Sequence, residues 1–232
     1  MDWETALSQV VHAIVADDVQ ELKRHADWIE ENDTLLIDGM PLICIAIANG
    51  SFGALDYLVA HGQDVRFADA DGDNLVILAS AASNVGPMRP QMIRKLLSYG
   101  LDVNLQNHKG ATALMLASAM GFEDAVQTLL DCGANAHIRD RQGKNAMHYT
   151  TMSPGMRAPS TAIIKLLSEF GANAEDIYDC DCCFALYNPM RSHMPQMVPR
   201  RRYSDAIIFD PDVVAVKVSK SAADYDYLFE TR

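Results

Sequence analysis

The sequence predicts an all-α solenoid of about five helix-pair units, joined by turn and hairpin links and followed by a short C-terminal extension. The first observation is two interleaved series of glycines that recur every 33 or 38 residues: Gly39, Gly72, Gly110 and Gly143, and then Gly62, Gly100, Gly133 and Gly171. The second observation is that each repeat carries two apolar patterns of helical period. A repeat of this length is typical of stacked helical supersecondary units, each of which buries its apolar face against its neighbours.

The units follow one another from the N-terminus. Residues 3–33 predict a divergent capping unit, because their apolar residues follow helical faces without the glycine pattern, and terminal repeats are usually atypical. Four further units begin at about residues 38, 71, 109 and 142. We therefore expect the solenoid to span residues 1–176, with a C-terminal cap and extension over residues 177–232.

Each of the four later units predicts a pair of helices. The first helices are expected after the first glycines, at residues 42–49, 75–82, 113–120 and 146–152. The second helix of the third of these units places Ala125, Val126, Leu129 and Leu130 at i, i+1, i+4 and i+5, which is one helix face rather than a strand alternation. The second glycine of each unit follows this helix, where a left-handed C-cap favours glycine.

Residues 110–135 carry the fullest version of the repeat, which opens at Gly110 and closes with Gly133 and the two residues after it. This motif resembles the ankyrin repeat, and the resemblance extends over roughly residues 34–176. The Thr-Pro-Leu-His segment of the family is complete in none of the units, and only the last unit keeps the histidine, His148. The resemblance implies a stack that binds proteins through its turn tips and the exposed side of its first helices.

Two of the units are five residues longer than the others, and both insertions fall between the paired helices, at residues 83–90 and 153–159. Each insertion contains Gly, Pro and a Met-Arg pair. One interpretation is inherited loop length without a function. The other is a two-pronged contact with one partner, because Met and Arg are enriched at protein interfaces.

The residues expected to contact a partner therefore come from the turn tips, the insertions and one first helix. They are Asp71, Asp73, Met88, Arg89, His108, Lys109, Met120, Arg139, Arg141, Lys144, Met156 and Arg157. The tips change from acidic to basic along the chain, which would hold a partner of matching charge in one direction only. Random surface variation is the alternative interpretation.

The C-terminal extension predicts three features. A cysteine cluster, Cys180, Cys182 and Cys183, has spacings of 2 and 1 and does not match the paired C-x₂₋₄-C spacing of structural zinc sites. Two β-rich runs around a Pro turn, residues 206–209 and 213–218, favour a β-hairpin. The acidic and aromatic run at residues 224–230 is either a frayed tail or a short docking segment.

Composition and charge exclude several classes of function. The chain has 232 residues, is 49% hydrophobic and carries a formal net charge of −12, which argues against a nucleic-acid-binding protein. Apolar runs are too short to span a membrane. The start lacks the basic and apolar regions of a secretory signal, and the five cysteines are an odd number, so we expect a cytoplasmic protein.

No nucleophile, metal or nucleotide motif is present, so no catalytic residue, metal or cofactor is assigned and no enzyme is expected. The whole charge imbalance lies in residues 1–75, which carry 15 acids against Lys23, Arg24 and Arg66. We therefore predict a protein partner, and first among specific functions an acidic inhibitor or immunity-type protein that neutralises a basic target such as a toxin or nuclease. The alternatives are an adaptor that bridges two proteins through the solenoid and the extension, and a metal-binding or enzymatic protein that uses the cysteine cluster. The oligomeric state stays open.

Overall fold

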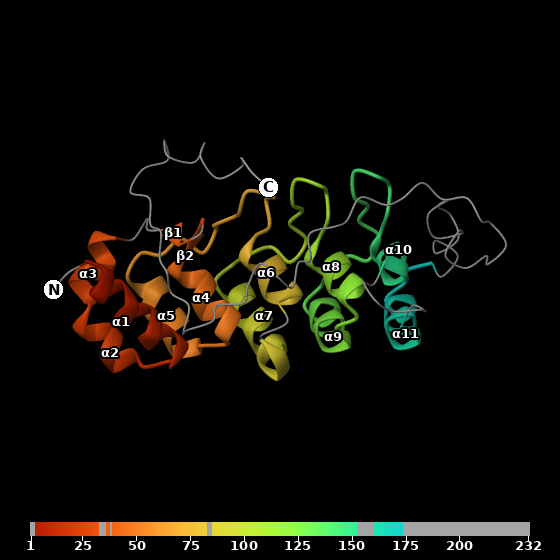
Figure 1. Ribbon diagram of the computed structural model, residues 1–232. Helices are drawn as coiled ribbons and strands as arrows, with labels where there is room; N and C mark the ends of the chain where they lie inside the picture. The colour runs from red at the N-terminus through yellow and green to blue at the C-terminus, as the bar shows by residue number, and fades with distance from the viewer. Residues whose placement is uncertain (1–2, 33–35, 38, 83–84, 153–159, 174–232) are drawn as a thin grey trace, which may run out of the picture. The chain divides into compact units, whose positions relative to one another are not determined.

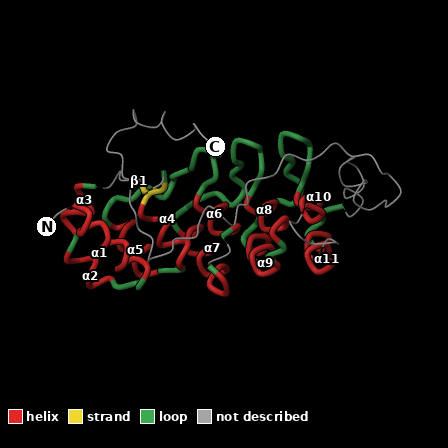
Figure 2. Tube along the Cα trace, viewed as in Figure 1, coloured by secondary structure: helices red, strands yellow, loops and turns green. Residues whose placement is uncertain are grey.

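The computed structural model describes residues 3–32, 36–37, 39–82, 85–152 and 160–173, and these residues are mostly helical (Figures 1 and 2). The predicted fold class, an all-α solenoid of helix-pair repeats, is confirmed. The predicted cysteine cluster, hairpin and tail of the extension lie outside the described residues, as do Met156 and Arg157. No helix among the described residues is long and apolar enough to cross a membrane.

The described chain divides into two compact bodies. The first body comprises residues 3–46 and 51–64, and the second comprises residues 47–50 and 65–173. The boundary therefore passes through one helix, α4.

The first body contains the predicted N-terminal cap and the first helix pair after it. Its elements are α1 (Trp3–Val15), α2 (Val19–Arg24), α3 (Ala26–Glu31), β1 (Leu36–Ile37), β2 (Met40–Pro41), most of α4 (Leu42–Asn49) and α5 (Phe52–Ala60). The strands pair antiparallel, with Leu36 opposite Pro41. Leu7, Ile14 and Leu22 from the cap are fully buried, as are Leu55 and Leu58 of α5.

An aspartate in the turn between α1 and α2 caps a helix that lies 36 residues away in the sequence. Asp17 accepts hydrogen bonds from the backbone N–H of Gly53 at 3.3 Å and of Ala54 at 2.7 Å, in the first turn of α5. Ser51, at the N-cap position of α5, makes no such side-chain bond. A Cβ at Gly53 would lie 2.8 Å from Val19 Cγ2, so this close approach requires glycine.

We expect Asp17→Ala to lower the free energy of unfolding by about 1 kcal/mol, because two N–H groups of α5 lose their acceptor at the positive end of the helix dipole. Ser51→Ala is the control, and it should leave stability nearly unchanged. Urea denaturation of the two variants measures the difference. Equal effects would show that Asp17 does not cap α5.

The first body also contains a tyrosine whose environment is negative. Burial, and then the carboxylates of Glu30 and Asp27, raise the pKa of Tyr57 above its ordinary value of 10.0. The folded state therefore favours the neutral phenol, and the resulting stability is complete below that value and lost as the pH rises above it. We expect Tyr57→Phe to reduce the loss of stability between about pH 8 and pH 11, measured by urea unfolding across that range. An unchanged pH profile would contradict this assignment.

The second body stacks three helix pairs. Its elements are α6 (Leu75–Ala81), η1 (Gly86–Met88), α7 (Arg89–Ser98), α8 (Ala113–Met120), α9 (Glu123–Asp131), α10 (Ala146–Tyr149), η2 (Thr150–Met152) and α11 (Thr161–Glu169). Among the first helices, α8 contacts both α6 and α10 in one layer, and the second helices α7, α9 and α11 form the other layer (Figure 1). The predicted helix bounds agree with the structure to within one residue in α6 and α8.

The first helices of the second body begin at equivalent capping residues. Asn74, Thr112 and Asn145 stand at the N-cap positions of α6, α8 and α10, and each side chain accepts a hydrogen bond from the first turn. Leu75 and Ile77 of α6 are buried, as are their counterparts Ala113 and Met115 in α8 and Ala146 and His148 in α10. This arrangement fixes where the loops between the pairs emerge.

Candidate functional site

Three turn tips, residues 69–73, 107–111 and 140–144, repeat the same local structure in the second body. In each tip the first residue accepts hydrogen bonds through one side-chain oxygen from the N–H groups two and four residues later, at 2.8–2.9 Å. These residues are Asp69, Asn107 and Asp140. Asn and Asp are favoured here because their short side chains close such turns. The backbone of each tip is therefore held by its own side chain.

Glycine follows at the fourth residue of each tip and adopts a positive φ of 76–78°. At Gly72 and Gly110 the next tip approaches closely as well. A Cβ on Gly72 would lie 2.7 Å from the His108 ring, and one on Gly110 would lie 2.8 Å from Arg141 N. These two glycines are required by conformation and by space.

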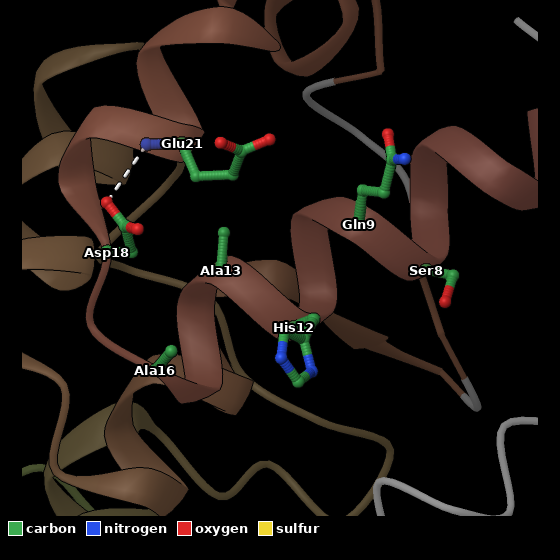
Figure 3. A pocket seen from close by; sticks show the side chains of 7 residues that line it. All are labelled: Ser8, Gln9, His12, Ala13, Ala16, Asp18 and Glu21. Carbon is green, nitrogen blue, oxygen red and sulfur yellow. Dashed lines mark hydrogen bonds between the residues drawn. The ribbon is translucent and has the colours of Figure 1, made fainter.

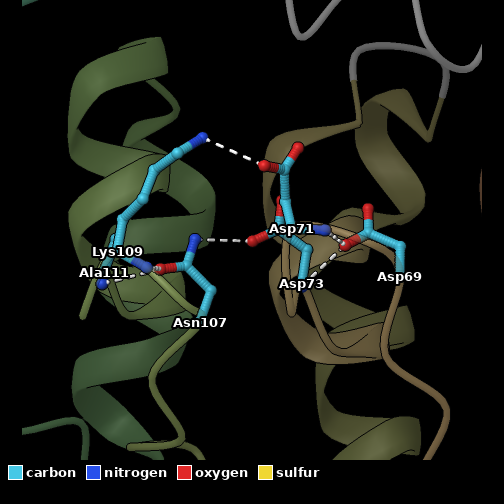
Figure 4. Close-up of polar contacts among 6 residues, drawn as sticks. All are labelled: Asp69, Asp71, Asp73, Asn107, Lys109 and Ala111. Carbon is cyan, nitrogen blue, oxygen red and sulfur yellow. Dashed lines mark hydrogen bonds and ion pairs between the residues drawn. The ribbon is translucent and has the colours of Figure 1, made fainter.

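Neighbouring tips are joined by backbone and side-chain hydrogen bonds, and Figure 4 shows the side-chain contacts between the first two tips. The His108 N–H donates to Asp71 O at 3.0 Å, and the Arg141 N–H donates to Lys109 O at 3.0 Å. Between the first two tips, Asn107 Nδ2 donates to Asp73 Oδ1 at 2.7 Å. The tips thus form one connected row.

Of the ten described residues that the sequence predicted as partner contacts, six are exposed. Asp71, His108, Lys109, Arg139 and Arg141 are exposed at or beside the tips. Lys144 and Met120 are half-buried. Met88 is 49% exposed at the end of η1.

Two of the predicted contact residues are instead buried, which corrects the prediction. Asp73 is 0% exposed because its carboxylate faces inward and accepts the hydrogen bond from Asn107. Arg89 is 4% exposed. Its guanidinium bonds Asp124 at 3.0 Å and Ala82 O at 3.1 Å and lies 3.7 Å from the centre of the Phe122 ring. These two side chains hold the second body together and present nothing to a partner.

Sequence reasoning missed two kinds of residue near the tips. Asn107 is the first residue of its tip, where the two equivalent tips have Asp. This difference was the signal in the sequence for its bond to Asp73. Leu105 and Ile138 occupy equivalent positions two residues before their tips, and Leu105 is 43% exposed. The sequence showed that these two residues hold the same position in their repeats, but it did not show how exposed they are.

The first body has an open pocket of about 410 Å³ on α1 and α2 (Figure 3). Its lining residues are Ser8, Gln9, His12, Ala13, Ala16, Asp18 and Glu21. Asp18 already accepts the N–H groups of Gln20 and Glu21 at 3.0 Å, and Glu21 pairs with Arg24. Within the described part of the chain, no group of three or more His, Cys, Asp or Glu side chains could hold a metal ion. The turn tips are therefore the stronger candidate site.

Comparisons with known proteins identify the repeats. The pattern of the family described as ankyrin repeats in three copies matches residues 78–178. The chain is 30% identical over 139 residues to palmitoyltransferase AKR1 of Lachancea kluyveri, covering 60% of this chain and 18% of that protein. It is 26% identical over 174 residues to human ankyrin repeat and SOCS box protein 6, covering 72% and 38% of the two chains.

A third relative is putative ankyrin repeat protein R664 of Acanthamoeba polyphaga mimivirus, which is 31% identical over 93 residues, or 40% of this chain and 57% of that protein. The chain thus spans less than two thirds of the length of each of these three relatives. Together with the repeated helix pairs and turn tips, these matches show that residues 78–178 contain ankyrin repeats, and repeats of this kind support protein–protein interaction.

Proposed function

We propose that this chain is a protein-binding module whose contact surface is formed by the exposed side chains of the three turn tips. The observation that carries the proposal is the repeated turn, in which Asp69, Asn107 and Asp140 satisfy the backbone N–H groups of their own tips. A loop that is already ordered loses little conformational entropy when a partner binds. Side chains on such loops are well placed for recognition.

Site-specific photocrosslinking in the native cells tests this proposal. A photoreactive residue replaces Arg141 in one variant and His108 in another, and Lys165, exposed on α11, is replaced in the control. We expect the same partner to be crosslinked from both tip positions and not from α11. Crosslinking from the α11 position alone, or equally from all three positions, would show that the tips are not the contact surface.

We also propose that the two insertions between paired helices contribute to partner binding. Met88 is exposed and stays a proposed contact residue, whereas the proposed contribution of Arg89 is withdrawn because it is buried. Met156 and Arg157 lie outside the described residues, so their role in a two-pronged contact stays a prediction. Deletion of residues 153–157 should weaken binding of the crosslinked partner if that prediction is correct.

A second proposal concerns the partner's chemistry. We infer an acidic inhibitor or immunity-type role against a basic target, because the excess of carboxylates lies in residues 1–75. Glu30 and Asp27 raise the pKa of Tyr57, as carboxylates do where the electrostatic potential is negative. The adaptor, metal-binding and enzymatic alternatives depend on residues 177–232, which lie outside the described part of the chain, and they stay predictions.

The inhibitor proposal is tested with a basic partner recovered from the native cells. We expect an equimolar amount of the chain to abolish the partner's activity and high salt to restore it. Asp27→Lys with Glu30→Lys should weaken inhibition, whereas Asp102→Lys with Glu169→Lys, which makes the same change in net charge within the second body, should not. Inhibition that is insensitive to salt and to the first pair would overturn the proposal.

A further inference from the structure

Two neighbouring loops of the second body gather positive charge in a chain whose net charge is −12. Residues 104–111 and 135–144 contain four cations and a single carboxylate, Asp140. We define the basic tip surface as these cations with the two apolar residues beside them: Leu105, Lys109, Ile138, Arg139, Arg141 and Lys144. Its sign is opposite to that of residues 1–75.

The two loops are held side by side along their length. Asn104 Oδ1 accepts the Asn135 N–H at 2.8 Å, and Gln106 Nε2 donates to Arg139 O at 3.0 Å. On the first loop, Leu105 lies between Asn104 and Gln106, which make these two contacts. On the other loop, Ile138 lies between their partners, Asn135 and Arg139. At the tip itself, the Arg141 N–H donates to Lys109 O. The cations and the two apolar side chains therefore belong to one continuous surface.

The carboxylates close to this surface already have partners. Asp140 accepts the Gln142 and Lys144 N–H groups at 2.8 and 2.9 Å, and its other oxygen accepts the Tyr149 hydroxyl at 2.8 Å. Asp71 pairs with Lys109 at 3.3 Å, but both side chains are largely exposed. An exposed pair contributes little to stability, so a partner's carboxylate can take the place of Asp71 beside Lys109.

The apolar residues distinguish this surface from a simple polyanion site. Leu105 is 43% exposed and Ile138 is half-buried, and both flank the cations. Apolar area that a ligand covers adds to affinity, whereas a phosphate backbone would gain nothing from it. The net negative charge of the whole chain also opposes a nucleic acid.

We propose, on the basis of the proposed protein-binding function, that the basic tip surface binds an extended acidic segment of a partner protein in which carboxylate side chains alternate with apolar ones. The carboxylates pair with Lys109, Arg139 and Arg141. Arginine suits this role because its planar guanidinium binds a carboxylate through two donors. The apolar side chains cover Leu105 and Ile138.

Fluorescence anisotropy with the full chain tests this inference. The probe is a short labelled peptide in which glutamate alternates with leucine, and the comparison peptide alternates lysine with leucine. We expect only the glutamate peptide to bind, with an affinity that falls as salt rises. Arg139→Glu with Arg141→Glu should weaken binding by at least about tenfold, because two attractive charge pairs become repulsive. Leu105→Ser should weaken it less, and Leu105→Met should preserve it.

The matched control is Arg94→Glu with Lys165→Glu, which makes the same change in net charge on α7 and α11 and should leave binding unchanged. Circular dichroism melting curves verify that each variant is folded. Equal loss in the two charge-reversed variants, binding of the lysine peptide, or full competition by a single-stranded oligonucleotide would overturn the inference. If a partner crosslinks from Arg141 but the glutamate peptide does not bind, this inference fails while the protein-binding function stands.

Discussion

Asn107→Asp is expected to lower the free energy of unfolding by about 3 kcal/mol. Asn107 Nδ2 donates to Asp73, which is fully buried, and Asn107 Oδ1 accepts the N–H groups of Lys109 and Ala111 at 2.9 Å (Figure 4). An aspartate would keep the two accepted bonds but lose the donor. Two carboxylates would then face each other away from water, where like charges repel strongly.

The pH dependence of this variant identifies the cause. Repulsion is expected to raise the pKa of one of the two carboxyl groups in the folded variant above its unfolded value of about 3.9. The stability that the variant loses relative to the native protein should therefore be smallest below about pH 3.9 and should grow as the pH rises through the folded pKa. Urea denaturation of the variant and the native protein at acidic and neutral pH measures this difference.

Two further variants separate charge repulsion from general damage to the tip. Asp69→Asn changes the equivalent residue of the neighbouring tip and keeps the accepting oxygen, so it should be nearly neutral. Asp73→Asn combined with Asn107→Asp exchanges donor and acceptor and should recover most of the lost stability. Failure of this exchange to recover stability would contradict the proposed hydrogen bond as the source of the effect.

Arg89→Ala is expected to cost a similar amount, about 3 kcal/mol. The buried guanidinium joins three parts of the second body: it donates to Ala82 O at the end of α6, pairs with Asp124 in the first turn of α9, and stacks on Phe122. Alanine would remove all three contacts and leave a cavity at the start of α7. The midpoint of urea unfolding measures the loss.

Conservative variants identify which contact matters at this position. Arg89→Met fills the volume without the charge, and Asp124 remains partly exposed to water, so this change should cost less than Arg89→Ala. Arg89→Lys keeps the charge, but its compact ammonium lacks the flat face that covers Phe122. An unfolding midpoint that does not change in Arg89→Ala would mean that the three contacts contribute no net stability.

The sequence by itself determined the repeat, the helix pairs and the position of the turn tips. The two glycine series predicted the period, and glycine at the fourth tip residue reflects a conformational need that is local to the turn. Apolar residues at helical spacing predicted the helices of the second body. This signal is also local, because the period of a helix is a property of the backbone. The exposure of Asp71, Lys109 and Arg141 followed from their place in those turns.

Only the tertiary structure decided which polar residues of the tips and insertions are buried. Asp73 and Arg89 are charged residues, which usually lie on the surface. They are buried here because Asn107 and Asp124, which lie 34 and 35 residues away in the sequence, bond their charged groups. Likewise, Leu105 and Ile138 share one surface because Asn104 and Gln106 bond the next loop. Burial of a charged group depends on whether another segment supplies its hydrogen bonds, and no local pattern encodes that pairing.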